Sequence, residues 1–266
     1  MTNTTPIKQT LDGILKTYLD NIQRGGRDGT SEMEIRFGTA RGMKPVSRIE
    51  YDDVIKRLMS AGFTLRNSEY HLRIFSEYTD PKTGVTRISN VRAELSGLST
   101  ISEYCKSDTL DKIYTDGRVK FIQKSFQRIN GDIAEPYDAT DYNFKATLSL
   151  EKDLTQTTLA RSMVTSWKDS KKEFRYLNRH SLVHPDYPFV VDMSIVRQSA
   201  RKGRNTERSY TFKDAKLQSS QDKYEIEIEV NNYDVGIGTK YNTPLELASA
   251  IKKTIMLILS GHQNTN

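Results

Sequence analysis

The helical patterns of apolar residues lie near the two ends of the chain. One apolar stripe predicts a helix over residues 5–23, and a second predicts a helix over 50–61 that stops at Gly62. A third pattern follows the capping box Thr243-Pro244-Leu245-Glu246 and predicts a helix that ends before Gly261. These helices flank a long central region of a different character.

Between residues 63 and about 230, apolar and polar residues tend to alternate, which is typical of strands rather than helices. Together with the segment that precedes the second helix, the expected strands are 31–38, 63–66, 70–79, 85–95, 118–128, 142–151, 171–183, 188–197, 206–213 and 223–230. No internal repeat or low-complexity linker divides the chain. The pattern predicts a mainly β protein of the α+β class, with one antiparallel barrel or strongly curved sheet.

Two of these strands carry glutamate at every second position. Glu32 and Glu34 precede Arg36 in the first, and the last contains Glu225, Glu227 and Glu229. Alternate residues share one face of a strand, and two unit charges about 7 Å apart repel by roughly 2 kcal/mol at an effective dielectric near 20. Cations would relieve this repulsion, and Mg²⁺ and Mn²⁺ prefer such oxygen ligands. The alternative is a half-buried strand with isoleucines in the core and glutamates in water.

Several other strands place charged side chains on one face. The sets that share a face are Arg92 with Glu94; Lys120, Lys124 and Arg128; Lys145, Thr147, Ser149 and Glu151; Arg175 with Arg179; and Asp192 with Ser194. Each set alone is compatible with a solvated strand face. Taken together they predict a barrel with a basic wall facing an acidic floor, which suits phosphoryl transfer: cations neutralise the phosphate and carboxylates orient water.

Composition limits the classes of protein that remain. Hydrophobic residues make up 36% and charged residues 28% of the 266 residues, and the net charge of +6 suits an anionic substrate or nucleic acid. The single cysteine, Cys105, excludes an internal disulfide and a cysteine-based zinc site. The chain shows no signal-peptide pattern and no apolar stretch long enough for a membrane span. We therefore expect a cytoplasmic protein that is not secreted.

Three segments, in order along the chain, resemble the metal-dependent RNA triphosphatases of the triphosphate tunnel metalloenzyme superfamily, in particular those of capping enzymes in large DNA viruses and fungi. SEMEIRFG resembles the opening Glu-x-Glu strand of that family, and YEIEIEV resembles its closing strand. The block FRYLNRHSLVHPDYPFVVDMSIVRQS resembles the Arg-Tyr-x-x-Arg-x-Ser strand and the Asp-hydrophobic-Ser strand of the viral members.

The resemblance implies an eight-stranded antiparallel β tunnel, spanning residues 1–266 as one domain, that removes the γ-phosphate from 5′-triphosphate RNA. It implies Mg²⁺ or Mn²⁺ held by the five glutamates, and a place beside guanylyltransferase and methyltransferase domains or subunits of a capping apparatus, in a viral factory or virion if the protein is viral. The residues implied in catalysis and substrate binding are Arg175, Arg179, Lys124, Lys145, Glu151, Asp192, Arg92, Arg36, Ser194 and Arg197.

The chain departs from the family pattern at two positions. Leu177 stands between Arg175 and Arg179, where family members commonly have lysine, and Phe126 stands where a second base would follow Lys124. Either another base replaces the lost contact at Leu177, or the tunnel is weakened or shifted in substrate. Arg201, Lys202 and Arg204 lie in a basic stretch over 197–208 that would either guide RNA at the tunnel mouth or form a plain basic hairpin.

Two other functions remain open at this stage. A hydrolase of free nucleotides, tripolyphosphate or thiamine triphosphate would use the same chemistry, and a degenerate tunnel would bind RNA or act as a scaffold without catalysis. Guanylyl transfer by this chain itself is not expected, because the segment Tyr114-Thr115-Asp116-Gly117 lacks the lysine nucleophile of the Lys-x-Asp-Gly motif and is predicted to be a hairpin turn.

Overall fold

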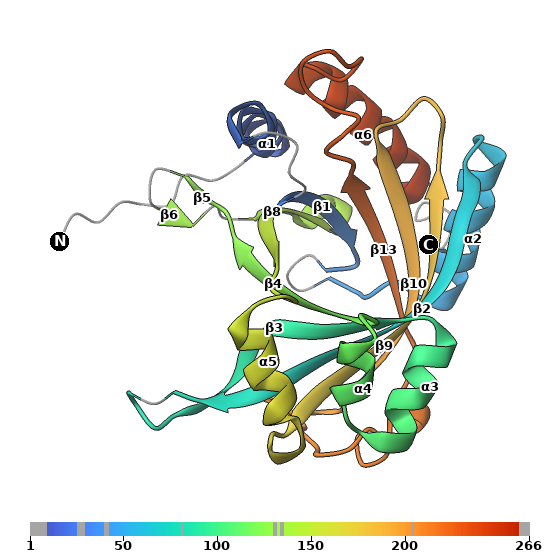
Figure 1. Ribbon diagram of the computed structural model, residues 1–266. Coiled ribbons are helices and arrows are strands. Elements are labelled where there is room, and N and C mark those ends of the chain that lie inside the picture. The colour runs from blue at the N-terminus through green and yellow to red at the C-terminus, as the bar shows by residue number, and fades with distance from the viewer. Residues whose placement is uncertain are drawn as a thin grey trace.

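A closed antiparallel β-barrel forms the centre of the computed structural model (Figure 1). The structure describes residues 10–25, 30–39, 43–80, 82–129, 132–133, 136–203 and 205–260. Around the barrel the strands are β1 (Ser31–Phe37), β13 (Lys223–Val230), β10 (Phe189–Gln198), β9 (Lys172–Val183), β2 (Thr64–Thr79), β3 (Thr86–Ser96), β4 (Val119–Phe126) and β8 (Phe144–Asp153). The barrel closes because β8 pairs back with β1.

Three smaller β elements lie outside the barrel wall. The short strand β7 (Tyr137–Ala139) pairs with β8. The two-residue strands β5 (Arg128–Ile129) and β6 (Asp132–Ile133) form one small hairpin, and β11 (Arg201–Lys202) and β12 (Asn205–Thr206) form another. The basic stretch at 201–206 is therefore a hairpin, and its Arg204 lies outside the described residues.

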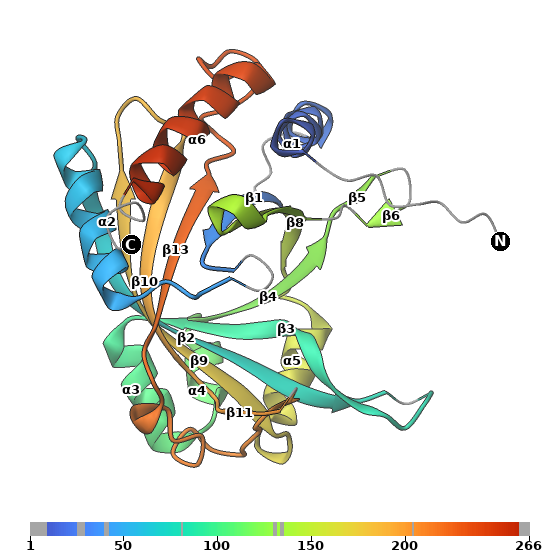
Figure 2. The same ribbon diagram turned by 180° about the vertical axis from the view of Figure 1, so that it is seen from behind.

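Helices cover the outer face of the barrel in two groups (Figures 1 and 2). The first group is α1 (Leu11–Gly25), α2 (Arg48–Ser60) and α6 (Pro244–Leu259), and it shares a hydrophobic core with Met33, Ile35, Ile226 and Ile228 of β1 and β13. The second group is α3 (Leu98–Ser107), α4 (Asp111–Thr115) and α5 (Thr158–Thr165), with the 3₁₀ turns η2 (Trp167–Asp169) and η3 (Leu217–Ser219); a third, η1 (Thr140–Tyr142), precedes β8.

This arrangement explains the alternating glutamates. Ile35, Ile226 and Ile228 point outward and are covered by helices. The alternation of side chains along a strand then sends the intervening glutamates into the barrel. The apolar residues of these strands form the core, as the alternative interpretation required, but the glutamates face a cavity instead of bulk water.

Most predicted elements are confirmed, with boundaries shifted by a few residues. The predicted strands 63–66 and 70–79 are one strand, β2. The prediction of a strand over 206–213 is wrong beyond Thr206: the amide of Phe212 donates to the Asp108 side chain, 2.7 Å away, instead of to a neighbouring strand. Helices α3, α4 and α5 were not predicted.

Two further details concern segments near helix ends. The helix predicted over 5–23 begins at Leu11 in the structure, and its first predicted residues lie outside the described part of the chain. The predicted hairpin turn at Asp116-Gly117 is wrong, because these residues end helix α4, where Gly117 takes a positive φ of 68°. Within the described residues, no helix combines the length and apolarity that crossing a membrane would require.

One buried lysine makes the stability of the outer core depend on pH. Lys172 is fully buried, its ammonium donates to the carbonyls of Ser170 (2.7 Å) and Tyr210 (3.1 Å), and it lies 5.3 Å from the Trp167 ring centroid. Burial lowers the pKa of Lys172 to about 8. The unfolded chain keeps this proton up to about pH 10.4, so folding releases a proton between these values.

We therefore expect the free energy of unfolding of the wild type, relative to Lys172→Met, to rise between about pH 8 and pH 10. The rise should approach about 1.4 kcal/mol per pH unit. Urea denaturation of both proteins across this range measures the difference, and tyrosine titration cancels because the variants share every tyrosine. A difference that does not change with pH would mean that Lys172 keeps its proton in the folded state.

Candidate functional site

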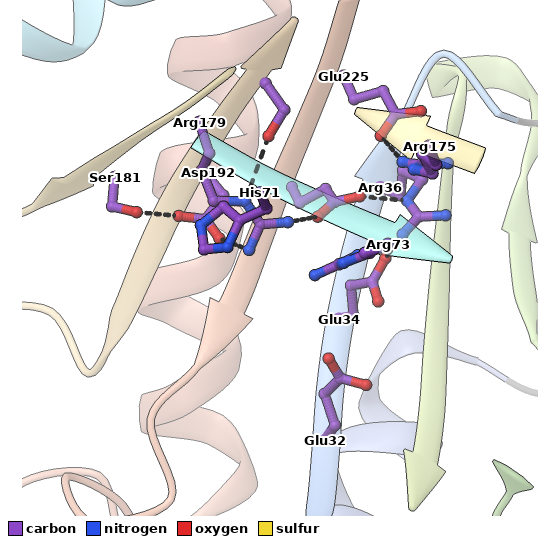
Figure 3. Close-up of polar contacts among 12 residues, drawn as sticks. Glu32, Glu34, Arg36, His71, Arg73, Arg175, Arg179, Ser181, Asp192 and Glu225 are labelled. Carbon is purple, nitrogen blue, oxygen red and sulfur yellow. Dashed lines mark hydrogen bonds and ion pairs between the residues drawn. The ribbon is translucent and has the colours of Figure 1, made fainter. Parts of the chain in front are cut away.

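A cavity of about 1110 Å³ lies inside the barrel. Charged residues from seven of the eight strands line it, which are Glu32, Glu34, Arg36, Glu69, His71, Arg73, Arg92, Glu94, Lys120, Lys124, Lys145, Glu151, Arg175, Arg179, Glu227 and Glu229. Acids and bases are both numerous, so the site can bind a cation and a polyanion at once. Figure 3 shows part of this lumen.

The acidic floor comes from β1 and β13. Glu34 and Glu229 are directly opposite each other in the register of these two strands, and Glu32 is two residues from Glu34 on the same face. Glu32 accepts a hydrogen bond from Ser149 Oγ at 2.9 Å. Three carboxylates therefore project from neighbouring positions of the barrel wall, as the alternating pattern predicted.

Lys124 of β4 reaches across to this floor. Its ammonium contacts the carboxylates of Glu32 and Glu34, the latter at 2.9 Å, and lies 3.9 Å from Glu151 Oε1. Burial alone would lower the pKa of Lys124, but Glu34 and Glu32 outweigh it and the pKa is raised. Lys124 thus stays protonated and supplies a positive charge next to the glutamates.

A chain of ion pairs continues from Glu34 to β9. Arg36 contacts Glu34 at 2.6 Å and Glu227 at 2.6 Å, and Glu227 also contacts Arg179 at 3.3 Å. Figure 3 labels Glu34, Arg36 and Arg179 in this part of the lumen. Burial alone would raise the pKa of Glu227, but Arg36 and Arg179 hold it well below its ordinary range. Glu227 is therefore a buried anion on which two arginines depend.

Arg179 is fixed by two further groups of β10. Its Nη1 lies 2.7 Å from Asp192, and its Nε donates to Ser194 Oγ at 3.3 Å. Ser181 in turn donates to Asp192 at 2.6 Å (Figure 3). Asp192 and Ser194 are buried behind the arginine, so they orient Arg179 instead of lining the cavity.

A second network forms the opposite wall. Glu94 accepts from Arg73 at 3.2 Å and from Arg92 at 3.0 Å, and Arg92 also contacts Glu151 at 3.0 Å. Burial alone would raise the pKa of Glu94, but Arg73 and Arg92 lower it to about 2. Glu151, proposed from its place on β8, is therefore held by Arg92 and lies near Lys124.

Glu229 differs from the other glutamates of the floor. Burial, with the added negative charge of Glu32 and Asp192, raises its pKa to about 8. A cation bound nearby would offset both this loss of solvation and the neighbouring negative charges. This is the observation that bears most directly on a metal.

The donor set fits a hard divalent ion. All donors at the floor are carboxylate oxygens, which Mg²⁺ and Mn²⁺ prefer, and burial together with neighbouring carboxylates raises the pKa of Glu229. The side chains are not arranged as a ready ligand shell: no group of three or more His, Cys, Asp or Glu with metal-binding geometry occurs among the described residues. Metal binding would need Lys124 to release Glu32 and Glu34.

The cavity gathers most of the predicted site residues. Glu225 contacts Arg175 instead of the floor, and Lys145 lies opposite Arg36 in the β1–β8 register. Arg197, which the resemblance implied in substrate binding, does not line the cavity. Alternation along β10 puts Arg197 on the other face from Asp192 and Ser194, where it contacts Asp222 at 2.6 Å.

Strand β2 supplies lumen residues that the sequence analysis did not find. Glu69, His71 and Arg73 all line the cavity, and Arg73 contacts Glu94. Their alternation is present in the segment Glu69-Tyr70-His71-Leu72-Arg73, with Leu72 fully buried on the outer face. His71 and Arg73 lie inside the predicted strand over 70–79, but nothing in the sequence shows which of its faces borders the cavity.

Comparison with known proteins rests on structure. No family model and no curated protein matches the chain. The Mimivirus capping enzyme triphosphatase aligns over 92% of this chain with 15% identity and a TM-score of 0.52 in a monoclinic form, and 12% and 0.54 in a triclinic form, covering 94% and 95% of the viral chain. The chain has the tunnel fold of these RNA triphosphatases.

A fungal protein, the S. pombe RNA triphosphatase Pct1 in a complex with the Spt5 CTD, is similar to the chain in fold. It aligns over 96% of both chains with 11% identity and a TM-score of 0.53. The tunnel fold therefore extends over nearly all of the chain, and the predicted eight-stranded antiparallel barrel with helices at both ends is confirmed. At such low identity the likeness concerns the fold alone.

Proposed function

We propose that the protein is a divalent-metal-dependent RNA 5′-triphosphatase, which hydrolyses the γ-phosphate of 5′-triphosphate RNA to leave a 5′-diphosphate end. The observation that carries the proposal is the presence of an acidic floor and a basic wall in one closed tunnel. A site that only bound RNA would gain nothing from buried glutamates, which repel phosphates. Phosphoryl transfer needs both signs of charge.

The residues divide into two roles under this proposal. Glu32, Glu34 and Glu229 would hold Mg²⁺ or Mn²⁺, which would neutralise charge on the transferred phosphate. Arg175, Arg179, Lys124 and Lys145 would bind the phosphate oxygens, since charge-assisted hydrogen bonds orient such groups strongly. Asp192, Ser194 and Glu227 hold Arg179 in place, and Glu151 holds Arg92.

The product would be the substrate of guanylyl transfer, the next reaction in mRNA capping. Tyr114 occupies the place of a lysine nucleophile, and Asp116-Gly117 only ends helix α4. Guanylyltransferase and methyltransferase activities would therefore come from other domains or subunits. Hydrolysis of free nucleotides or tripolyphosphate by the same tunnel is the second candidate, because the described cavity is wide enough for several anions but shows no group that would recognise a particular leaving group.

Metal removal tests the proposal. We expect the wild type to release phosphate from γ-labelled 5′-triphosphate RNA with Mg²⁺ or Mn²⁺, and to lose at least about 99% of this activity in EDTA, because metal charge stabilisation is worth several kcal/mol. Adding back the ion should restore the rate. Competition by ATP and tripolyphosphate then ranks the substrates. A folded protein that binds metal but releases no phosphate would favour a degenerate tunnel, with Leu177 as its mark.

A further inference from the structure

Two arginines face each other across neighbouring strands of the tunnel wall. Arg73 of β2 is directly opposite Arg175 of β9 in the antiparallel register, and both line the cavity. Figure 3 draws them in the same part of the lumen, together with Arg36 of β1. Like charges directly opposite on a sheet destabilise it. An anion bound between Arg73 and Arg175 would reduce the repulsion between the two guanidinium groups.

The carboxylates nearby compensate this pair only in part. Arg73 donates from Nε to Glu94 at 3.2 Å, and Glu94 is shared with Arg92. Arg175 contacts Glu225 through Nη2, while its Nε is buried with no hydrogen-bond partner. Burial lowers the pKa of Arg175, and the charges of Arg73 and Arg36 lower it further against the effect of Glu225. A guanidinium carries five N–H donors, so both side chains can bind more acceptors.

Leu177, the next position after Arg175 on the same face of β9, supplies no cation to the lumen. Leu177, between Arg175 and Arg179, is fully buried next to Val196 of β10 and His71 of β2. Burial lowers the pKa of His71, so its imidazole is neutral at neutral pH. Arg73, two residues along the same face of β2, is therefore the cation that this strand provides to the lumen beside Arg175.

We propose that Arg73 and Arg175 form a cross-strand clamp for one phosphate group of the polyphosphate chain, and that Arg73 replaces the base absent at Leu177. The proposal rests on the proposed function and names a phosphate ligand on a strand to which none was assigned. Two guanidinium groups on opposite sides can each present paired N–H donors to a tetrahedral phosphate. No bond forms or breaks at the clamp; it positions the substrate.

The test compares Arg73→Gln, Arg73→Lys and the control Arg87→Gln, which changes an exposed arginine of β3 outside the cavity. The probe is β,γ-imido-ATP with Mg²⁺, whose bridging nitrogen resists hydrolysis, measured by isothermal titration calorimetry. We expect Arg73→Gln to weaken binding about 10- to 100-fold, as for loss of hydrogen bonds to a charged group. Arg73→Lys should fall between it and the wild type, and Arg87→Gln should match the wild type.

Thermal unfolding without the probe separates binding from structure. Because Arg92 still pairs with Glu94 in Arg73→Gln and the repulsion by Arg175 is removed, the melting temperature should change little, whereas a purely structural role of Arg73 would lower it. Wild-type binding that Arg73→Gln retains in full would overturn the clamp and leave the proposed function standing. A folded wild type that does not bind the probe, with Mg²⁺ or in EDTA, would overturn the clamp, and phosphate release from 5′-triphosphate RNA would then decide the proposed function separately.

Discussion

Replacing Glu227 by alanine should lower the free energy of unfolding by about 3–5 kcal/mol and abolish triphosphatase activity. The reason is that Glu227 is almost fully buried between Arg36 at 2.6 Å and Arg179 at 3.3 Å. Breaking a buried ion pair leaves uncompensated charge in a poorly solvated place, which costs about this amount. Arg179 would also lose a group that orients it toward the lumen.

Two further variants provide a control at an exposed glutamate and a milder change at Glu227 itself. Glu207→Ala removes an exposed glutamate after β12 and should leave stability within about 0.5 kcal/mol of the wild type. Glu227→Gln keeps the shape but removes the charge, so its stability should lie between those of Glu227→Ala and the wild type. Urea denaturation and single-turnover phosphate release at the same temperature measure both effects. A stable Glu227→Ala protein with full activity would show that neither arginine depends on Glu227.

Replacing Glu34 by glutamine should reduce phosphate release about 1000-fold, with a much smaller effect on stability. Glu34 contacts Lys124 at 2.9 Å and Arg36 at 2.6 Å, and an amide oxygen can still accept from either. What the variant loses is one negative oxygen ligand in the acidic floor. Under the proposed function this removes several kcal/mol of metal-dependent stabilisation, and about 4 kcal/mol corresponds to a factor of 1000.

The measurement is a titration of activity and of direct Mn²⁺ binding for Glu34→Gln beside Glu207→Gln. We expect Glu34→Gln to need more metal and to remain slow at saturation, whereas Glu207→Gln behaves as the wild type. If both variants bind Mn²⁺ alike and release phosphate alike, Glu34 holds no metal. The role of the floor would then be limited to pairing with Lys124 and Arg36.

The sequence predicted the barrel well because its strands bury one face under helices. The isoleucines of β1 and β13 alternate with the glutamates, so the same period of two specifies both the core and the lumen. The carboxylates and bases on those faces could therefore be named before the structure. The partners of each charge could not, since they depend on the register of strands that are distant along the chain, such as Lys124 with Glu34.

The errors have local physical causes. Helices α3 and α5 are short, with ten and eight residues, and give only two or three buried positions each, which is too few for a clear helical period. Arg197 was implied by the resemblance alone; it lies three positions after Ser194, and an odd offset along a strand places two side chains on opposite faces. Arg73 lies inside the predicted strand over 70–79, but its partner Glu94 belongs to another strand, so the sequence alone did not show that Arg73 faces a lumen.

The position of β1 has a consequence for how the chain folds. This strand comes early in the sequence, yet it lies between β8 and β13, which come about 110 and 190 residues later. The barrel can close only after both partners exist, so its formation depends on contacts of high sequence separation, which slow folding. A chain that stops before Lys223 would leave the edges of β1 and β10 unpaired, and exposed edges promote aggregation. During synthesis, one edge of β1 therefore stays unpaired until β13 has been made.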